Sequence, residues 1–220
     1  MHGSLNLLKL LNLLFYFSFF KKINGKTFYF TPDVFSPQFF VVSSTFFIQH
    51  LSIPKGSMVL DMGTGSGILA IFASESAQKV VATDINPHAI QNARINVRLN
   101  NLSIKIELRC GNLFQPITEK FDVILFNPPY YPLKPKTYME AAWCCGTNYF
   151  CLRTFLTNAK KHLTQRGFIQ ISLSSYMDLD YIHKLIKKHG FRSILIARKF
   201  ILFETLYIYL LKPKISEGVD

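Results

Sequence analysis

Short apolar runs alternate with longer amphipathic segments from residue 58 to the end of the chain. The short runs, rich in Val, Ile, Leu and Phe, predict β-strands at 58–61, 80–83, 104–110, 121–126 and 168–173. The longer segments predict helices at 67–73, 87–100, 149–163 and 181–189. A final pair of runs, at 193–199 and 204–211, predicts an antiparallel hairpin at one sheet edge. We therefore expect an α/β fold with a mostly parallel seven-stranded sheet and helices on both faces.

The most apolar segment runs from Leu5 to Phe20. It has 16 residues, whereas a membrane-spanning helix needs about 20, so no transmembrane span is expected. Its polar residues recur every three positions, as on one narrow stripe of a helix: Asn6, Lys9 and Asn12. The sequence predicts an N-terminal apolar helix within 1–25, packed against a single domain over 26–220. An interfacial membrane helix and a partner-binding surface are the alternatives.

Lys and Arg outnumber Asp and Glu by 25 to 13, which gives a formal charge of +12. Residues 61–159 carry nine basic and seven acidic residues, so the two flanks supply +10 of the +12. This excess favours a nucleic-acid partner or a substrate that lies beside RNA. The four cysteines form no C-x-x-C pair and have no His at zinc-ligand spacing, so neither a metal site nor a disulfide framework is expected.

Three glycines occupy alternate positions between the first predicted strand and its helix: Gly63, Gly65 and Gly67. Glycine allows a tight turn and lets the backbone approach a ligand, because it has no Cβ. The dinucleotide fingerprint requires Gly or Ala where this chain has Ile68, and no Gly-Lys-Ser/Thr follows. The spacing instead resembles the first motif of class I methyltransferases that use S-adenosylmethionine (SAM). A bare structural turn is the alternative.

Asp84 ends the second predicted strand, where an acid can accept hydrogen bonds from both hydroxyls of a ribose. The alternative is that Asp84 only caps the helix that opens at Asn86-Pro87. After the third strand, Asn112 stands where many SAM-binding relatives have Asp for the exocyclic amine of adenine. Its carbonyl oxygen can accept the same hydrogen bond without the charge.

The segment Asn127-Pro128-Pro129-Tyr130 directly follows the strand at 121–126, where open α/β sheets bind ligands. Two prolines fix φ and remove two backbone donors, so the Asn127 and Pro128 carbonyls can point rigidly at a substrate. A planar NH₂ nitrogen attacks carbon poorly, because its lone pair is delocalised. If the Asn127 side-chain oxygen and the Pro128 carbonyl accept from that NH₂, they orient it and favour the charge that develops. Tyr130 is expected to offer its ring face to the amide or base, and a Pro-Pro turn without function is the alternative.

Together these motifs resemble HemK/PrmC-type SAM-dependent methyltransferases, which modify a glutamine amide in translation release factors. The resemblance is to the short form without the bacterial N-terminal helical domain, and it implies a class I, Rossmann-like fold. It also covers Thr83-Asp84-Ile85-Asn86-Pro87, Glu140-Ala141-Ala142-Trp143 and the segment from Thr31 to Thr45. It implies that SAM is held by Thr45, Asp61, Gly63, Gly65, Gly67, Asp84, Ile85, Asn112 and Leu113. It implies catalytic roles for Asn127, Pro128, Pro129 and Tyr130, with Asn127 contacting both cofactor and substrate.

The leading hypothesis is therefore a cytoplasmic N-methyltransferase that acts on a protein glutamine. The closest alternative is methylation of the exocyclic nitrogen of adenine, or of guanine, in RNA or DNA, with the flipped base stacked on Tyr130. A third hypothesis is a non-catalytic SAM-fold protein attached to a membrane through Leu5–Phe20. The basic flanks fit a macromolecular substrate in a ribosome- or RNA-associated setting, and the need for an activating subunit stays open.

Overall fold

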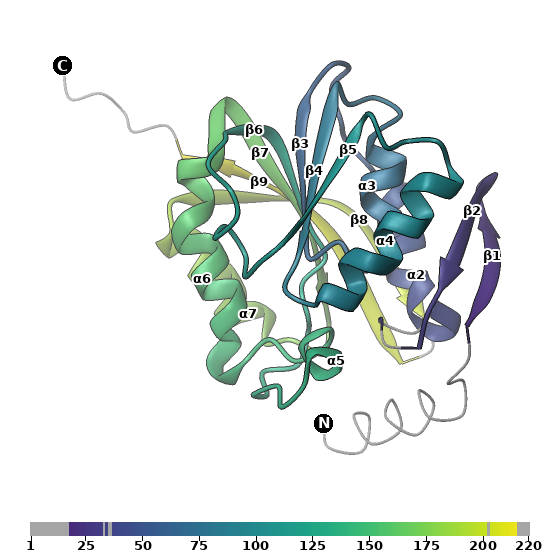
Figure 1. The fold of residues 1–220 in the computed structure, drawn as a ribbon. Coiled ribbons are helices and arrows are strands. Elements are labelled where there is room, and N and C mark those ends of the chain that lie inside the picture. The colour runs from purple at the N-terminus through teal and green to yellow at the C-terminus, as the bar shows by residue number, and fades with distance from the viewer. Residues whose placement is uncertain (1–17, 33, 35–36, 202, 215–220) are drawn as a thin grey trace.

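Within the residues that the computed structural model describes (18–32, 34, 37–201 and 203–214), seven strands form a central sheet (Figure 1). They are β3 (Met58–Met62), β4 (Lys79–Asp84), β5 (Ile106–Cys110), β6 (Phe121–Phe126), β7 (Leu163–Ser174), β8 (Phe191–Ile201) and β9 (Glu204–Pro213). Their order is β5-β4-β3-β6-β7-β9-β8. Pairing is parallel from β5 to β7, and β9 is antiparallel to both β7 and β8. The predicted mostly parallel sheet with a C-terminal antiparallel hairpin is confirmed.

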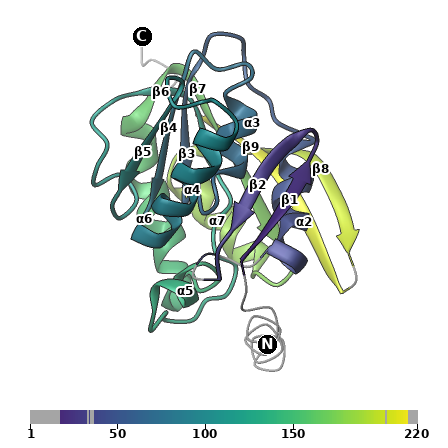
Figure 2. The ribbon, with the colours of Figure 1, turned by 45° about the vertical axis from the view of Figure 1, so that its right-hand side comes forward.

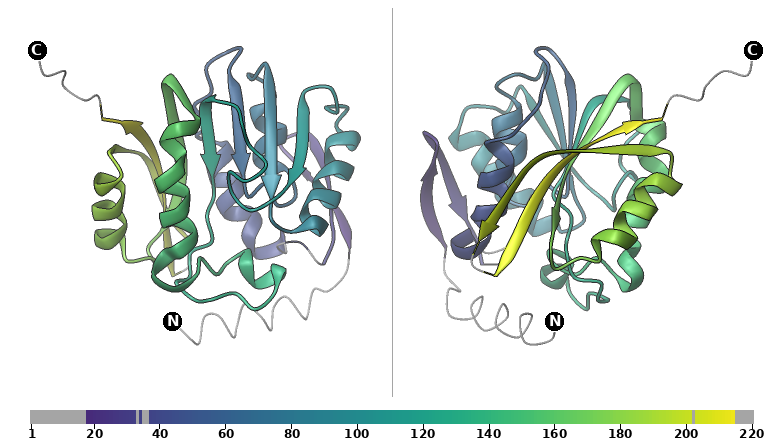
Figure 3. Two further views of the ribbon diagram at one scale, coloured as in Figure 1. Left: turned by 60° about the vertical axis from the view of Figure 1, so that its left-hand side comes forward. Right: turned by 180° about the vertical axis from the view of Figure 1, so that it is seen from behind.

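Helices cover both faces of this sheet (Figures 1 and 3). The helices are α2 (Pro37–Ile48), α3 (Ile68–Ala73), α4 (Pro87–Leu99), α5 (Tyr138–Ala141), α6 (Phe150–Ala159) and α7 (Leu179–Lys188), with 3-10 turns η1 (Thr147–Tyr149) and η2 (Lys160–His162). Side chains alternate across each strand, so Leu60 and Met62 of β3 join a core with α6 and α7, whereas Val59 joins a core with α2 and α3. Both faces of the sheet are therefore buried, as the continuous apolar strands predict.

Local capping explains where two of the predicted helices lie. Asn86 is the N-cap of α4: its side-chain oxygen accepts a hydrogen bond from the N–H of His88 at 3.0 Å, and Pro87 takes the first helical position. Gly190, with a φ of +77°, follows the end of α7. The helices predicted at 87–100 and 181–189 are confirmed to within two residues at each end.

The predicted helix at 149–163 is longer than the helix observed. Asn148 and Tyr149 have left-handed backbones, with φ of +51° and +55°, so regular helix begins only after them. After η2 the chain is already extended at Leu163, which pairs with Phe121. β7 therefore begins five residues earlier than predicted, because the neighbouring strand β6 supplies a pairing partner that local periodicity does not reveal.

Phe19 and Phe20 lie in a strand, which corrects the helix predicted to include them. β1 (Phe19–Ile23) and β2 (Lys26–Phe30) form an antiparallel hairpin (Figure 2). Its turn is Asn24-Gly25, and both residues have positive φ. The sequence carries this signal, because Asn-Gly is the preferred two-residue hairpin turn, and strand pairing overrides the helical stripe of polar residues. The rest of the predicted helix, up to residue 17, lies outside the described residues.

The hairpin is bound to the same unit as the sheet. Asn96 of α4 accepts from the N–H of Tyr29 at 2.6 Å and donates to its carbonyl at 2.9 Å. Asn100 makes the same pair of bonds with Thr27, at 3.2 and 2.8 Å. The boundary predicted between residues 25 and 26 therefore falls inside a hairpin that packs as part of the domain. In the described part of the chain, no helix combines the length and the apolar character needed to cross a membrane.

Candidate active site

The carboxyl ends of the parallel strands meet at one edge of the sheet. The strand order reverses at β3, because the chain continues to β4 on one side while β6 lies on the other. Met62, the last residue of β3, pairs with Thr83 of β4 and with Phe126 of β6, so the loops after these strands begin side by side. Open α/β sheets bind ligands at such a switch point. The glycine loop, Asp84 and the Asn-Pro-Pro-Tyr segment are thereby brought together.

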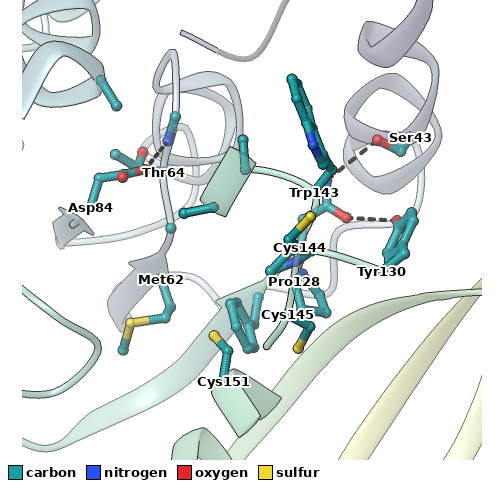
Figure 4. A pocket seen from close by; sticks show the side chains of 18 of the residues that line it. Ser43, Met62, Thr64, Asp84, Pro128, Tyr130, Trp143, Cys144, Cys145 and Cys151 are labelled. Carbon is teal, nitrogen blue, oxygen red and sulfur yellow. Dashed lines mark hydrogen bonds between the residues drawn. The ribbon is translucent and has the colours of Figure 1, made fainter. Parts of the chain in front are cut away.

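A cavity of about 820 Å³ occupies this edge (Figure 4). Its size is that of a small-molecule site. Ten of the thirteen predicted site residues line it: Gly63, Gly65, Asp84, Ile85, Asn112, Leu113, Asn127, Pro128, Pro129 and Tyr130. The other three, Thr45, Asp61 and Gly67, are outside its wall. The two groups therefore need separate physical accounts.

The glycine loop forms one wall of the cavity. Gly63 and Gly65 have φ of +67° and +56°, in the left-handed region that favours glycine. A Cβ on Gly65 would meet no atom within 4 Å, so the backbone there is open to a ligand. Gly67 points the other way, since a Cβ on it would lie 3.3 Å from the Cβ of Ala93 on α4. The predicted cofactor contact of Gly67 is therefore replaced by a packing role.

Asp61 lies behind the glycine loop and is fully buried. One carboxylate oxygen accepts from the Thr64 hydroxyl at 2.6 Å and from the N–H of Ala70 at 3.0 Å. The other oxygen has no hydrogen-bond partner among the described residues. Burial raises the pKa of this carboxyl to about 7, and the charge of Asp84 acts in the same direction. Asp61 thus ties the loop to the start of α3 from outside the cavity wall, and its predicted contact with SAM stays a prediction.

Asp84 faces the cavity at the end of β4. Its two carboxylate oxygens each accept one backbone N–H, from Gly65 and from Asn86, both at 2.9 Å. Each oxygen keeps further acceptor capacity, so the pair fits the two hydroxyls of a ribose. Burial raises the pKa of this carboxyl above its usual value. The capping alternative is not supported, because the N-cap of α4 is Asn86.

Asn127 is held by hydrogen bonds from two sides, by Tyr130 and Ser43, both labelled in Figure 4. The Tyr130 hydroxyl donates to Asn127 Oδ1 at 2.8 Å and shares a hydrogen bond of 2.7 Å with the hydroxyl of Ser172 on β7. Asn127 Nδ2 donates to Ser43 Oγ on α2 at 3.4 Å. Burial raises the pKa of Tyr130, which keeps its hydroxyl protonated as a donor. The structure thus gives Tyr130 a hydrogen-bonding role that the predicted ring stacking did not include.

Thr45 lies on α2, whose residues 42–44 line the cavity. Successive residues of an α-helix differ by about 100° in direction, so one further residue turns the side chain away. The hydroxyl that reaches Asn127 is that of Ser43. The cavity is thus lined by the three residues that precede Thr45, and the contact of this segment with SAM stays a prediction.

The cavity also contains four residues that were not among the predicted site residues, although Trp143 belongs to the Glu140–Trp143 motif. They are Tyr131, Trp143, Tyr176 and Glu204, and the rings of Tyr131 and Tyr176 stack at 5.9 Å. Glu204 begins β9 and accepts from the Ser174 hydroxyl at 2.5 Å. Burial raises the pKa of this carboxyl. These four residues combine aromatic surface with one acid, a lining suited to a planar polar group.

One sequence signal could have found these partners. Gln170, Ser172 and Ser174 alternate with apolar residues in β7, and all three are fully buried. Polar residues at every second position of a buried strand lie on one face and must each find a hydrogen-bond partner. Two of them face this site, through Tyr130 and Glu204.

Known proteins resemble this chain over most of its length. The family model described as the methyltransferase small domain matches residues 25–202. A Methanocaldococcus jannaschii protein named as a candidate protein N5-glutamine methyltransferase is 35% identical over 184 residues, which are 80% of this chain and 90% of that protein. The ribosomal RNA small subunit methyltransferase C of Pseudoalteromonas translucida is 31% identical over 148 residues, which are 66% of this chain and 40% of that enzyme.

Solved structures show the same fold. The T. thermophilus 16S rRNA N2 G1207 methyltransferase, in complex with AdoMet (SAM) and guanosine, superposes with a TM-score of 0.67 at 20% identity, over 90% of this chain and 50% of that one. The Asp84 carboxylate and the open backbone of Gly65 fit the ribose and a closely approaching cofactor. With the family model covering four fifths of its length, the chain is a SAM-dependent methyltransferase and belongs to the methyltransferase small domain family.

Proposed function

We propose that this enzyme methylates the side-chain amide nitrogen of glutamine in a protein, such as a translation release factor. The observation that carries the proposal is the geometry of Asn127. Asn127 lines the cavity, and its side-chain oxygen is fixed by the Tyr130 hydroxyl at 2.8 Å. A carbonyl oxygen has two lone pairs, so Asn127 can accept a second hydrogen bond from a substrate NH₂.

The chain's own residues then act by orientation and electrostatics. SAM supplies an electrophilic methyl group on a sulfonium. Asn127 and the Pro128 carbonyl accept the two N–H groups of the substrate amide, which turns its nitrogen toward the methyl group. As the nitrogen–carbon bond forms and the sulfonium–methyl bond breaks, positive charge passes from sulfur to nitrogen, where the two acceptors stabilise it. The nitrogen then loses one proton to solvent, which leaves a neutral N-methylamide. The prolines hold these acceptors in place because their φ angles are fixed.

A protein amide fits the part of the cavity around Glu204 better than a nucleotide does. Glu204 can accept from a peptide or amide N–H, and when ionised it repels a phosphate. Tyr130 packs against both apolar cores and has its hydroxyl bound on two sides, so it supports Asn127 as well as the cavity wall. The M. jannaschii relative, named as a candidate protein N5-glutamine methyltransferase, adds weight to this choice. Methylation of adenine or guanine in RNA is the second candidate, favoured by the charge of +12 and the ribosomal RNA methyltransferase relative.

Labelling separates the two candidates. The enzyme is incubated with SAM carrying a radiolabelled methyl group and with whole-cell lysate, and the product is treated with protease or nuclease. We expect protease-sensitive label that acid hydrolysis releases as methylamine, because hydrolysis of an N-methylated amide frees its nitrogen. Asn127→Ala is the matched control and should incorporate little label. Nuclease-sensitive label would overturn the glutamine proposal. The proposed setting is the cytoplasm, and adding back lysate fractions to the purified enzyme would reveal an activating subunit.

A further inference from the structure

A second hollow, of about 320 Å³, lies between α6 and α7. It is lined by Arg153, Thr154, Thr157, Tyr181, Leu185, Lys188 and His189. Lys184 lies one helical turn before Lys188 on the same face of α7. The Lys160 ammonium lies 3.9 Å from the position that a Cβ on Gly190, the residue after His189, would take. Of the basic side chains, Arg153, Lys188 and His189 line the hollow, and we call them, together with Lys160, Lys184 and Lys187 outside it, the basic groove.

Within the part of the chain that the structure describes, the cations of the basic groove form no ion pair with an acidic side chain. Within the described residues, ion pairs engage Lys26, Lys79 and Arg109. The last two belong to β4 and β5, at the opposite edge of the sheet, where Glu107 and Glu119 neutralise them. Several cationic side chains held near each other repel one another, and a polyanion that binds across them relieves this repulsion.

Helix stability does not explain this arrangement. The helix dipole favours cations in the last turn of a helix, which suits Lys187 and Lys188 on α7. Arg153, however, lies in the first turn of α6, where the same dipole disfavours a cation. The acidic residues of α7 lie at its other end, where Asp178 caps the N–H of Tyr181 at 2.9 Å. The helix dipole therefore does not account for the placement of Arg153.

The basic groove adjoins the active-site cavity at Thr154. Thr154 lines both hollows, and the first turn of α6 also presents Phe150 and Cys151 to the cavity. Figures 1 and 3 show α6 and α7 as neighbours on the same face of the sheet. A linear polyanion held in the basic groove therefore lies next to the cavity in which methyl transfer takes place.

We infer that the basic groove binds the phosphate backbone of single-stranded RNA and anchors the enzyme beside its substrate. Lys184 and Lys188 are four residues apart on α7, about 6 Å along the helix, so they can contact successive phosphates of one strand. Tyr181, in the same hollow, offers an aromatic side chain for an unstacked base. A glutamine in a factor that works on RNA would then be methylated while the enzyme holds the neighbouring RNA.

RNA binding is tested with a fluorescein-labelled, unstructured RNA of about 20 nucleotides by fluorescence anisotropy, without SAM or methyl acceptor. The groove variant combines Lys184→Gln, Lys187→Gln and Lys188→Gln, all at exposed positions. The control combines Lys55→Gln, Arg94→Gln and Lys120→Gln, which removes the same charge from exposed positions elsewhere. Titration of each variant with SAM checks that it is folded.

We expect the groove variant to weaken RNA binding at least about 10-fold near 0.1 M salt, and the control less than about 2-fold. The slope of log K for RNA binding against log salt is negative, and its magnitude should decrease by about 2 in the groove variant. Each phosphate contact on a single strand contributes about 0.7, and three lysines are replaced. Equal weakening in both variants would overturn the inference in favour of diffuse attraction, and so would absence of RNA binding by the wild type. Polyglutamate that competes as well as unlabelled RNA would assign the groove to an acidic protein. None of these outcomes bears on glutamine methylation, because no methyl acceptor is present.

Discussion

The role of Asp84 can be tested without knowledge of the methylated substrate. Its carboxylate is fixed by the N–H groups of Gly65 and Asn86, both at 2.9 Å, and each oxygen has room for one ribose hydroxyl. Asp84→Asn keeps the shape but replaces one acceptor with a donor and removes the charge. Hydrogen bonds to charged groups contribute about 1.5–3 kcal/mol each. Losing one and weakening the other gives about 3 kcal/mol, or a Kd for SAM about 100-fold higher.

The decisive measurement is a thermodynamic cycle that changes the protein and the ligand in turn, with each binding affinity measured by isothermal titration calorimetry. Methylthioadenosine and its analogue without ribose hydroxyls are titrated into wild type and Asp84→Asn. If the carboxylate binds the diol, removing the hydroxyls weakens binding to the wild type far more than to the variant. Asp122→Asn is the matched control, because Asp122 also holds a backbone N–H, that of Met58 at 2.9 Å, but at the start of β6. An equal loss of affinity for both ligands in Asp84→Asn would show that Asp84 acts only by shaping the loop, and would refute the reasoning.

Three further outcomes follow from the same geometry. Asn127→Ala should lower turnover at least about 100-fold, with the Kd for SAM changed only a few-fold, because one transition-state acceptor is lost; normal turnover would remove Asn127 from the mechanism. Tyr130→Phe keeps the ring but removes the hydroxyl that holds the Asn127 amide, so we expect kcat to fall about 10-fold with little change in the Kd for SAM. Ser172→Ala leaves the 2.8 Å bond from Tyr130 to Asn127 intact and should lower kcat less. An unchanged kcat in Tyr130→Phe would leave only ring contacts for this residue. The pKa of Asp61 is raised from 3.8 to about 7, so the folded state holds its proton longer than the unfolded state, and stability falls as pH rises from about 4 to about 7. Urea unfolding across this range should show a shallower fall in Asp61→Asn, and identical pH profiles would contradict the raised pKa.

Much of the fold was readable from the chain because its signals are local. Strand and helix periods, Pro87 at the first position of α4 and Gly190 after α7 depend on neighbours within a few residues. The Asn24-Gly25 turn is equally local, yet the apolar run before it suggested a helix that strand pairing excludes at Phe19 and Phe20. Where two local signals disagree, as here, pairing with the neighbouring strand β2 decides between them.

The sequence by itself determined which residue types stand at the ends of the strands, namely a glycine turn, an acid and a Pro-Pro segment, because these depend only on residue type and spacing; the ribose and substrate contacts predicted from them stay predictions. Only the tertiary structure decided which residues face the cavity. Asp61 turns behind the loop and Thr45 turns away on α2, because the direction of a side chain depends on how its element is rotated in the packed fold. Ser172 reaches Tyr130 from 42 residues away through the placement of β7, and Glu204 enters the site only when β9 inserts between β7 and β8. Contacts between segments so far apart follow from the packing of the sheet, and no spacing along the chain encodes them.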